Sequence, residues 1–192
     1  MVLLLCACGV TVPTRYYTLF DAADFRAPRA RAASFVVDVQ PVGIPAQVDQ
    51  PQLVVREGDA GMRVLEHERW VAPLADEVRG ALTLMLGEQL AMQDAVATKA
   101  PAAGQALLAV KVDVQRFDSV PGEYAEVAAT WSLRYANRPP SVCTVHERQT
   151  VGQGYDELVR GHRRALARIA TQIAAAARRL AAGAAVVCTY DG

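Results

Sequence analysis

The 192-residue chain lacks the features that mark several large classes of protein. It carries 20 basic and 20 acidic residues, so its net charge is zero and no overall field recruits nucleic acid or an anionic membrane. No stretch reaches the roughly 18 apolar residues of a membrane-spanning helix, which excludes a polytopic membrane protein. No Cys-x-x-Cys pair occurs, and this argues against a zinc or thioredoxin-type site. The chain is long enough, and with 52% hydrophobic residues apolar enough, to bury a core as one globular domain.

Recognisable catalytic patterns are also missing. The Gly-x-Ser-x-Gly turn of α/β-hydrolases does not occur, and His67, His146 and His162 fall in different predicted elements. His146 begins a partial His-Glu-x-x-His zinc motif, but Thr150 stands where the second ligand belongs. His162 lies on the apolar side of a predicted helix and is expected to be a satisfied packing residue. We therefore expect no enzyme activity, no cofactor and no metal site.

The first residues are apolar and contain two cysteines. Leu5, Cys6, Ala7 and Cys8 have the form of a bacterial lipoprotein processing site, in which cleavage precedes a cysteine that is then acylated. Several acyl chains together hold a protein on a membrane without spanning it. Only seven uncharged residues precede Cys8, whereas a signal peptide has a basic start and a longer apolar core. The sequence predicts lipidation at Cys8, with residues 1–7 as a signal-peptide remnant; an ordinary disordered or strand-like terminus is the alternative.

Two further cysteines, Cys143 and Cys188, lie far apart in the sequence. In an oxidising periplasm they can pair, and the disulfide would stabilise the fold by roughly 3–4 kcal/mol in the chain-entropy model. Two buried free thiols are the open alternative.

Hydrophobic periodicity predicts a single domain of the α/β class. Alternating apolar and β-branched residues predict strands at 34–39, 52–56, 62–67, 106–114, 124–135 and 141–151, with a turn at 57–61. Spacing of three and four residues predicts amphipathic helices over 73–93 and 155–182. We expect one mixed, largely antiparallel sheet packed by two long amphipathic helices. Residues 8–33 are expected to form the lipidated N-terminus and tether, and residues 34–192 the domain. Within the tether, the apolar-aromatic stretch at 16–20 is consistent with a strand, and the rest is typical of a linker.

Three local features of the predicted domain bear on packing and partners. The second helix carries arginines mainly away from its apolar side, where we expect a solvated face rather than a binding site. The segment from Pro45 to Pro51 has two prolines around a polar centre, which predicts an ordered, exposed loop. Trp70, between the predicted hairpin and the first helix, is expected to anchor the core or a hinge.

Short motifs in a fixed order resemble the PqiC-type family of ABC transport auxiliary lipoproteins. They are Tyr16-Tyr17-Thr18-Leu19, Val39-Gln40-Pro41-Val42-Gly43-Ile44-Pro45, Asp49-Gln50-Pro51-Gln52-Leu53-Val54, Arg69-Trp70-Val71-Ala72-Pro73-Leu74, Val114-Gln115-Arg116-Phe117-Asp118, Val120-Pro121-Gly122 and Ala129-Thr130-Trp131-Ser132-Leu133. The likeness spans essentially the whole chain. It rests on the ordered set, because no single motif is specific.

The resemblance implies a noncatalytic periplasmic lipoprotein anchored in the outer membrane. It further implies a membrane-bound MCE-domain protein as partner in carrying phospholipid between the two membranes, and a ring-like homo-oligomer that docks on the MCE tube. We expect the partner contact at Ile44, Pro45, Asp49 and Pro51. Two rival classes remain. One is a periplasmic solute- or cell-wall-binding lipoprotein, which needs a concave polar pocket or clustered aromatic residues. The other is a secreted hydrolase, whose activity would be lost on changing His67 or His146.

Overall fold

The computed structural model describes residues 12–20, 35–92 and 106–188. The elements follow in the order β1 (Arg15–Tyr17), β2 (Phe35–Val39), β3 (Gln52–Glu57), β4 (Gly61–Trp70), α1 (Leu74–Gln89), β5 (Ala106–Val120), β6 (Tyr124–Tyr135), β7 (Ser141–Thr150) and α2 (Tyr155–Ala181). Every strand and helix expected from periodicity is present. The α/β class is therefore confirmed.

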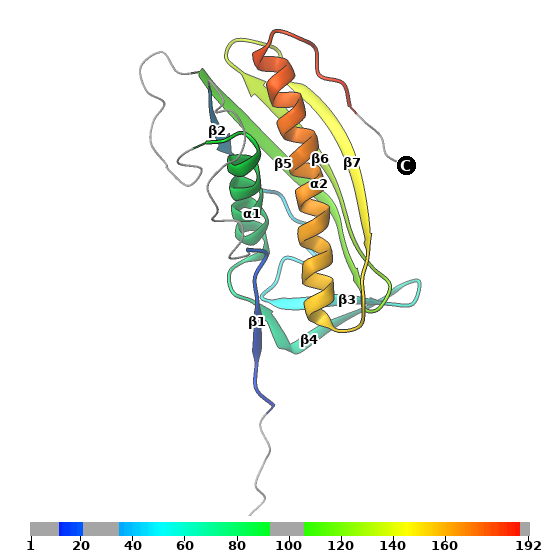
Figure 1. Cartoon of the computed structure of the whole chain (residues 1–192). Coiled ribbons are helices and arrows are strands. Elements are labelled where there is room, and N and C mark those ends of the chain that lie inside the picture. The colour runs from blue at the N-terminus through cyan, green and yellow to red at the C-terminus, as the bar shows by residue number, and fades with distance from the viewer. Residues whose placement is uncertain (1–11, 21–34, 93–105, 189–192) are drawn as a thin grey trace, which may run out of the picture.

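Four strands form a mixed sheet in the order β2-β5-β6-β7. β2 runs parallel to β5, whereas β5, β6 and β7 form the antiparallel meander expected from their alternation. Both helices lie over one face of this sheet (Figure 1). On β7 the residues that point to the other face, Val142, Thr144, His146 and Arg148, are exposed. We call this side the open face of the large sheet.

A second sheet of three strands, in the order β1-β4-β3, corrects the expectation of a single sheet. β3 and β4 form the predicted antiparallel hairpin, but the end of β4 pairs in parallel with β1, from Arg15 opposite Glu68 to Tyr17 opposite Trp70. Periodicity identifies a strand but not its partner, so it could not separate the two sheets. β1 lies in the range assigned to the tether, yet Tyr17 and Leu19 are buried and belong to the folded domain.

Only one of the two helices is long, which also corrects the expected architecture. α2 has 27 residues, whereas α1 has 16 and ends at Gln89, short of the predicted end at residue 93. Ala91 has a φ of 53°, a left-handed conformation that cannot continue a helix. α2 ends as expected near Gly183, which has a φ of 85° and whose N–H donates to the carbonyl of Leu180.

The core lies between the helices and the large sheet and continues into the small sheet. Leu82 of α1, Ile169 of α2 and Trp131 of β6 are among its fully buried side chains. Trp70 is also buried and packs edge-on against Phe117 with ring centroids 6.2 Å apart, so it takes the expected core position. Within residues 12–20, 35–92 and 106–188, no helix combines the length and apolar character needed to cross a membrane.

Candidate interaction surfaces

The three histidines lie in separate environments. His67 on β4 is exposed, and Nε2 of the half-exposed His146 lies 3.0 Å from Oε1 of Glu126. His162 is buried on α2, where Nε2 lies 2.8 Å from Oγ of Ser119 and the ring stacks on Phe117 with centroids 3.8 Å apart. Burial lowers the pKa of His162 to about 3, so the imidazole is neutral at neutral pH.

The Ser119 and His162 pair has the hydrogen bond of a nucleophile and its base but lacks access to a substrate. Both side chains are buried, and Nδ1 of His162, where a catalytic acid would bind, has no hydrogen-bond partner among the described residues. The predicted packing role is correct, but the histidine is satisfied at one nitrogen only. Among all the residues that the structure describes, no group of His, Cys, Asp or Glu is arranged to hold a metal ion.

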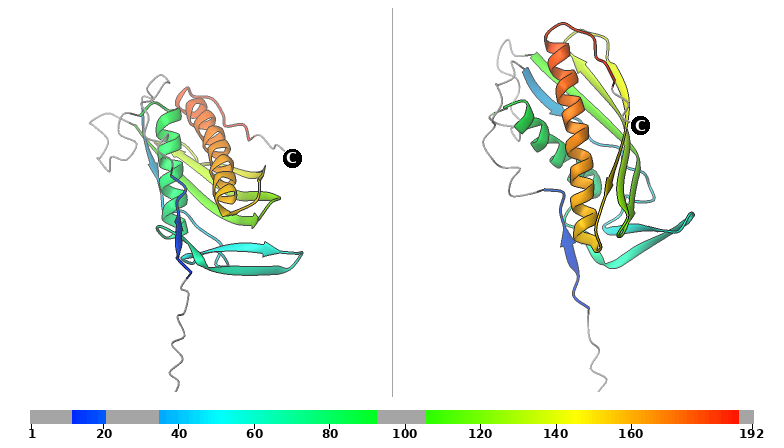
Figure 2. Two further views of the ribbon diagram at one scale, coloured as in Figure 1. Left: turned by 60° about the horizontal axis from the view of Figure 1, so that its bottom comes forward. Right: turned by 45° about the vertical axis from the view of Figure 1, so that its right-hand side comes forward.

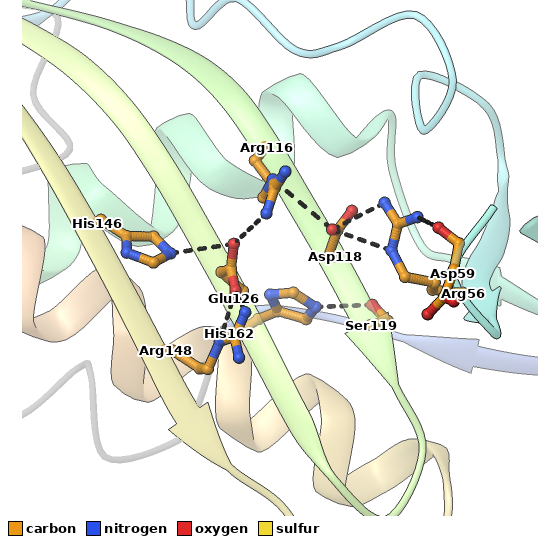
Figure 3. Close-up of polar contacts among 9 residues, drawn as sticks. All are labelled: Arg56, Asp59, Arg116, Asp118, Ser119, Glu126, His146, Arg148 and His162. Carbon is orange, nitrogen blue, oxygen red and sulfur yellow. Dashed lines mark hydrogen bonds and ion pairs between the residues drawn. The ribbon is translucent and has the colours of Figure 1, made fainter.

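A buried carboxylate lies at the centre of a charge network on the open face of the large sheet (Figure 3). The side chain of Glu126 is 0% exposed; it accepts hydrogen bonds from Arg116 at 3.0 Å and Arg148 at 2.6 Å, besides its contact with His146. Burial raises the pKa of Glu126, but hydrogen bonds from Arg116, His146 and Arg148 outweigh it, so the pKa is lowered overall. The carboxylate is therefore charged at neutral pH and links β5, β6 and β7.

The network continues to the small sheet through Asp118. Its side chain is 4% exposed, and its Oδ2 accepts hydrogen bonds from Nε and Nη2 of Arg56 on β3, at 3.1 and 2.8 Å. Nε of Arg116 lies 3.7 Å from the same oxygen, so Arg116 stands between Asp118 and Glu126. These contacts fasten the β3–β4 hairpin, which extends sideways at the end of the domain where α2 begins (Figure 2).

A hollow of about 430 Å³ opens beside the hairpin. Its lining consists of Arg56, Gly58, Asp59, Arg116, Asp118, Val120, Glu123 and Tyr124. The charged groups at its centre, Arg56, Arg116 and Asp118, already bind one another. Tyr124 is the aromatic residue of the lining, and its ring is covered by the Arg148 guanidinium at 4.0 Å. The hollow therefore lacks the clustered aromatics of a sugar- or peptide-binding site.

The exposed side of α2 is strongly basic. Between residues 158 and 181 the helix has no aspartate or glutamate and six arginines, which are Arg160, Arg163, Arg164, Arg168, Arg178 and Arg179. Arg160 pairs with Glu157, and Nε of Arg168 lies 2.8 Å from Oε2 of the buried Glu147. At least one arginine thus holds the helix to β7, so the face is more than the solvated surface we expected.

Four arginines of α2 donate hydrogen bonds to backbone oxygens. Nε of Arg163 donates to the carbonyl of Leu19 at 3.1 Å. Arg164 donates to the carbonyl of Thr150 at 3.0 Å, Arg179 donates to that of Ala185 at 2.9 Å, and Arg178 donates to that of Gln89. A carbonyl carries no net charge, so these contacts hold the side chains without neutralising them. We call Arg164, Arg178 and Arg179 the α2 basic face. Arg160 and Arg164 also line a smaller hollow of about 270 Å³ between α1 and α2.

The predicted partner contact lies in an ordered loop between β2 and β3. The N–H groups of Val48 and Asp49 donate to the carbonyl of Pro45 at 3.0 and 3.2 Å, which fixes the turn. Asp49 and Pro51 are exposed, whereas Pro45 is half-buried. Ile44 is also half-buried and packs against the core. Of the four predicted contact residues, Asp49 and Pro51 are therefore the exposed ones, and Ala46 and Gln47 of the same loop are exposed beside them.

Cys143 and Cys188 form a disulfide, with Cα atoms 5.6 Å apart. Cys143 is buried on β7, and Cys188 lies in the segment after α2, so the bond ties this segment to the edge of the large sheet. Cys8, the predicted lipidation site, lies outside the described residues.

Sequence reasoning did not find the network around Glu126. The turn after Val120 brings β6 back along β5 and places Asp118 directly opposite Glu126. Two carboxylates opposite each other repel. The sequence therefore gives no reason to expect this pairing until the arginines that separate the two carboxylates are known. Arg116 stands at a β-bulge and Arg148 on a third strand, and their positions depend on the register of the folded sheet.

Comparison with known proteins identifies the family. The model of the ABC-type transport auxiliary lipoprotein component family matches residues 17–174. The chain belongs to this family. The matched region begins at the end of β1 and extends into α2, so it includes strands of both sheets and the loop from Ile44 to Pro51.

Two crystal structures share the fold. One, of an uncharacterized protein, is 20% identical with a TM-score of 0.66 and is aligned over 85% of this chain and 98% of its own. The other, a Xanthomonas campestris protein of the DUF330 family, is 16% identical with a TM-score of 0.53 and is aligned over 84% of this chain and 90% of its own. At these identities the likeness shows the fold alone. Among curated proteins none matches the chain.

Proposed function

We propose that this lipoprotein is a noncatalytic docking subunit of an MCE-type system that carries phospholipid between the two membranes of a bacterial envelope. Lipid on Cys8 holds it at the periplasmic face of the outer membrane. Gly9 follows that cysteine, in place of the aspartate that retains lipoproteins at the inner membrane. The observation that carries the proposal is the family match over residues 17–174, because that family is described as an auxiliary component of ABC-type transport.

The polar groups of the domain support a structural rather than a chemical role. The best candidate for a nucleophile and base, Ser119 with His162, is buried. The charged groups of the open face, centred on Glu126 and Asp118, are bound to one another. Such groups brace the large sheet and its link to the small sheet.

Charge separation supports the assembly of several copies into a ring. The chain is neutral overall, yet residues 158–181 carry six arginines and no carboxylate. Arg160 and Arg168 pair with Glu157 and with the buried Glu147, so the carboxylates that could balance the α2 basic face lie outside residues 158–181. The α2 basic face of one copy can meet those carboxylates on the next, since the planar guanidinium fork suits a carboxylate. A contact between two different faces repeats around a closed ring.

The loop from Ile44 to Pro51 is the proposed contact with the MCE-domain protein. Its backbone is already hydrogen-bonded in the free chain, so docking orders little additional structure and costs less conformational entropy. Asp49 and Pro51 present the exposed surface, and Ile44 and Pro45 form the base that holds it.

Light scattering of the purified lipoprotein tests the ring. We expect an oligomer whose mass falls to that of a monomer when Arg164 and Arg178 are both changed to glutamate. Arg134→Glu is the matched control, because Arg134 is an exposed arginine on the open face of the large sheet. This control should leave the mass unchanged.

Binding to the purified MCE-domain protein tests the docking. Asp49→Arg should weaken binding about tenfold, a loss of about 1.4 kcal/mol, and leave the oligomer mass unchanged. Glu57→Arg, an exposed charge reversal on the hairpin, should change neither the binding nor the oligomer mass. A strictly monomeric lipoprotein that leaves the MCE protein unbound contradicts the proposal and favours the solute- or cell-wall-binding class.

A further inference from the structure

Exposed apolar side chains gather at β1 and β4. In the described part of the chain the exposed large apolar residues are Val12, Tyr16, Met62, Val64, Val71, Leu107, Val142 and Val187. Four of the eight lie on β1 or β4 or directly after them, and Val12 lies three residues before β1. Tyr16 and Val71 are the most exposed of all, at 64% and 63%.

The parallel pairing of β1 with β4 puts Tyr16 and Val71 on one side. Tyr16 pairs with Arg69, and Val71 lies two residues farther along, where its N–H still donates to the carbonyl of Tyr17 at 2.9 Å. Side chains alternate along a strand, so Tyr17 and Trp70 point the other way, and both are buried. The ladder therefore has one face in the core and one apolar face in solvent. We call Tyr16 and Val71 the β1 patch.

One arginine, Arg69, borders the β1 patch. The side chain of Arg69, the cross-strand neighbour of Tyr16, has a buried Nε with no hydrogen-bond partner among the described residues. Arg15 is exposed but lies on the opposite side of the ladder, with Tyr17 and Glu68. A tyrosine has an apolar ring with a polar tip, and arginine has an apolar stem with a cationic head. Both side chains suit the boundary between lipid tails and headgroups.

The β1 patch lies close to the proposed lipid anchor. Cys8 stands seven positions before Arg15, and an extended chain spans at most about 3.6 Å per residue, so the two are separated by about 25 Å or less. The chain enters the domain through β1, at the end of the molecule where α2 begins (Figure 1). A bilayer that holds acyl chains on Cys8 therefore lies within reach of Tyr16.

We propose that the β1 patch contacts the bilayer that carries the anchor. Tyr16 and Val71 enter the interface, and Arg69 meets the headgroup phosphates. The inference rests on the proposed function, because acylated Cys8 brings the patch to the membrane. The contact fixes the domain in one orientation, with β1 toward the lipid, in place of free rotation on the tether.

A polarity-sensitive dye on a single thiol tests this contact. Val71→Cys in the acylated full chain supplies the thiol, since Cys143 and Cys188 are bonded to each other and Cys8 carries lipid. Leu107→Cys is the matched control, because it is an exposed apolar residue near the start of β5. With vesicles of phosphatidylethanolamine and phosphatidylglycerol, the dye at position 71 should shift to shorter wavelength and brighten several-fold. The dye at position 107 should not change.

The same measurement on a full chain with serine at positions 6 and 8 separates the patch from the anchor. With vesicles in large excess this unacylated chain should still show the shift at position 71, and Tyr16→Ser should abolish it. If the wild-type chain fails to float with vesicles while this shift persists, the anchor fails and the patch stands. Emission at position 71 that is identical with and without vesicles in both chains overturns the inference. A shift that follows protein concentration without vesicles also overturns it, because a second copy then covers the patch.

Discussion

Arg56 donates two hydrogen bonds to one carboxylate oxygen of Asp118, from Nε at 3.1 Å and from Nη2 at 2.8 Å. Arg56 belongs to the small sheet and Asp118 to the large sheet, so this ion pair joins the two sheets directly. The side chain of Asp118 is 4% exposed, and a buried carboxylate is costly without its cationic partner. The position of the hairpin therefore depends on this pair.

Arg56→Ala should lower the free energy of unfolding by about 1–3 kcal/mol, since Arg116 alone remains near the buried Asp118. Urea denaturation measures the loss. Arg63→Ala is the control on the same hairpin: Arg63 also pairs with a carboxylate, but both it and its partner Glu57 are about half exposed. That variant should lose about 0.5 kcal/mol or less. Equal losses in the two variants would show that the Arg56–Asp118 pair between the sheets stabilises the fold no more than an exposed ion pair does.

Glu126→Gln should lower the free energy of unfolding by about 2–4 kcal/mol at neutral pH, because it leaves Arg116 and Arg148 facing each other without the carboxylate between them. The folded pKa of Glu126 is lowered, so its stabilisation is present above the unfolded pKa and is lost as pH falls through the folded pKa. The difference between wild type and variant should shrink on acidification. A difference that stays constant down to acid pH would contradict a charged carboxylate.

His162 should make the fold sensitive to acid. Its pKa falls from 6.5 to about 3 on burial, so in this range the unfolded chain binds a proton that the folded chain excludes. The contribution of His162 to the free energy of unfolding is fully present above about pH 6.5. It falls at lower pH by about 1.4 kcal/mol per pH unit. His162→Leu should remove this part of the slope, whereas Ser119→Ala, which retains the histidine, should keep it. Identical slopes in wild type and His162→Leu would refute the assignment.

Cys188→Ser should lower the free energy of unfolding by about 3–4 kcal/mol in the chain-entropy model, because the bond closes a long loop from β7 through α2. A reducing agent should lower the melting temperature of the wild type but leave that of the variant unchanged. Intact mass spectrometry of the oxidised protein should find no free thiol at Cys143 or Cys188. Two alkylated cysteines there would restore the alternative of free thiols.

Local patterns in the sequence were sufficient to place the elements but not to assemble them. Alternation places β6 at Tyr124–Tyr135 and β7 at Ser141–Thr150, close to the predicted bounds, because each strand has one face in the core. The partner of β4 depends on β1, far away in the sequence, and no periodicity reports such a contact. The same limit hid the surroundings of Glu126, since its partners Arg116 and Arg148 come from two other strands.

Docking of the anchored lipoprotein on an MCE-domain protein is tested most directly in the living cell. A photoreactive amino acid in place of Asp49 should give a covalent adduct with the MCE-domain protein in the outer-membrane fraction. The same probe in place of Thr144, exposed on the open face of the large sheet, should give none. Cys8→Ser should release the chain into the soluble periplasm and abolish the adduct. Probes at Asp49 and Pro51 that yield no MCE adduct from an acylated, membrane-bound lipoprotein would contradict the docking role.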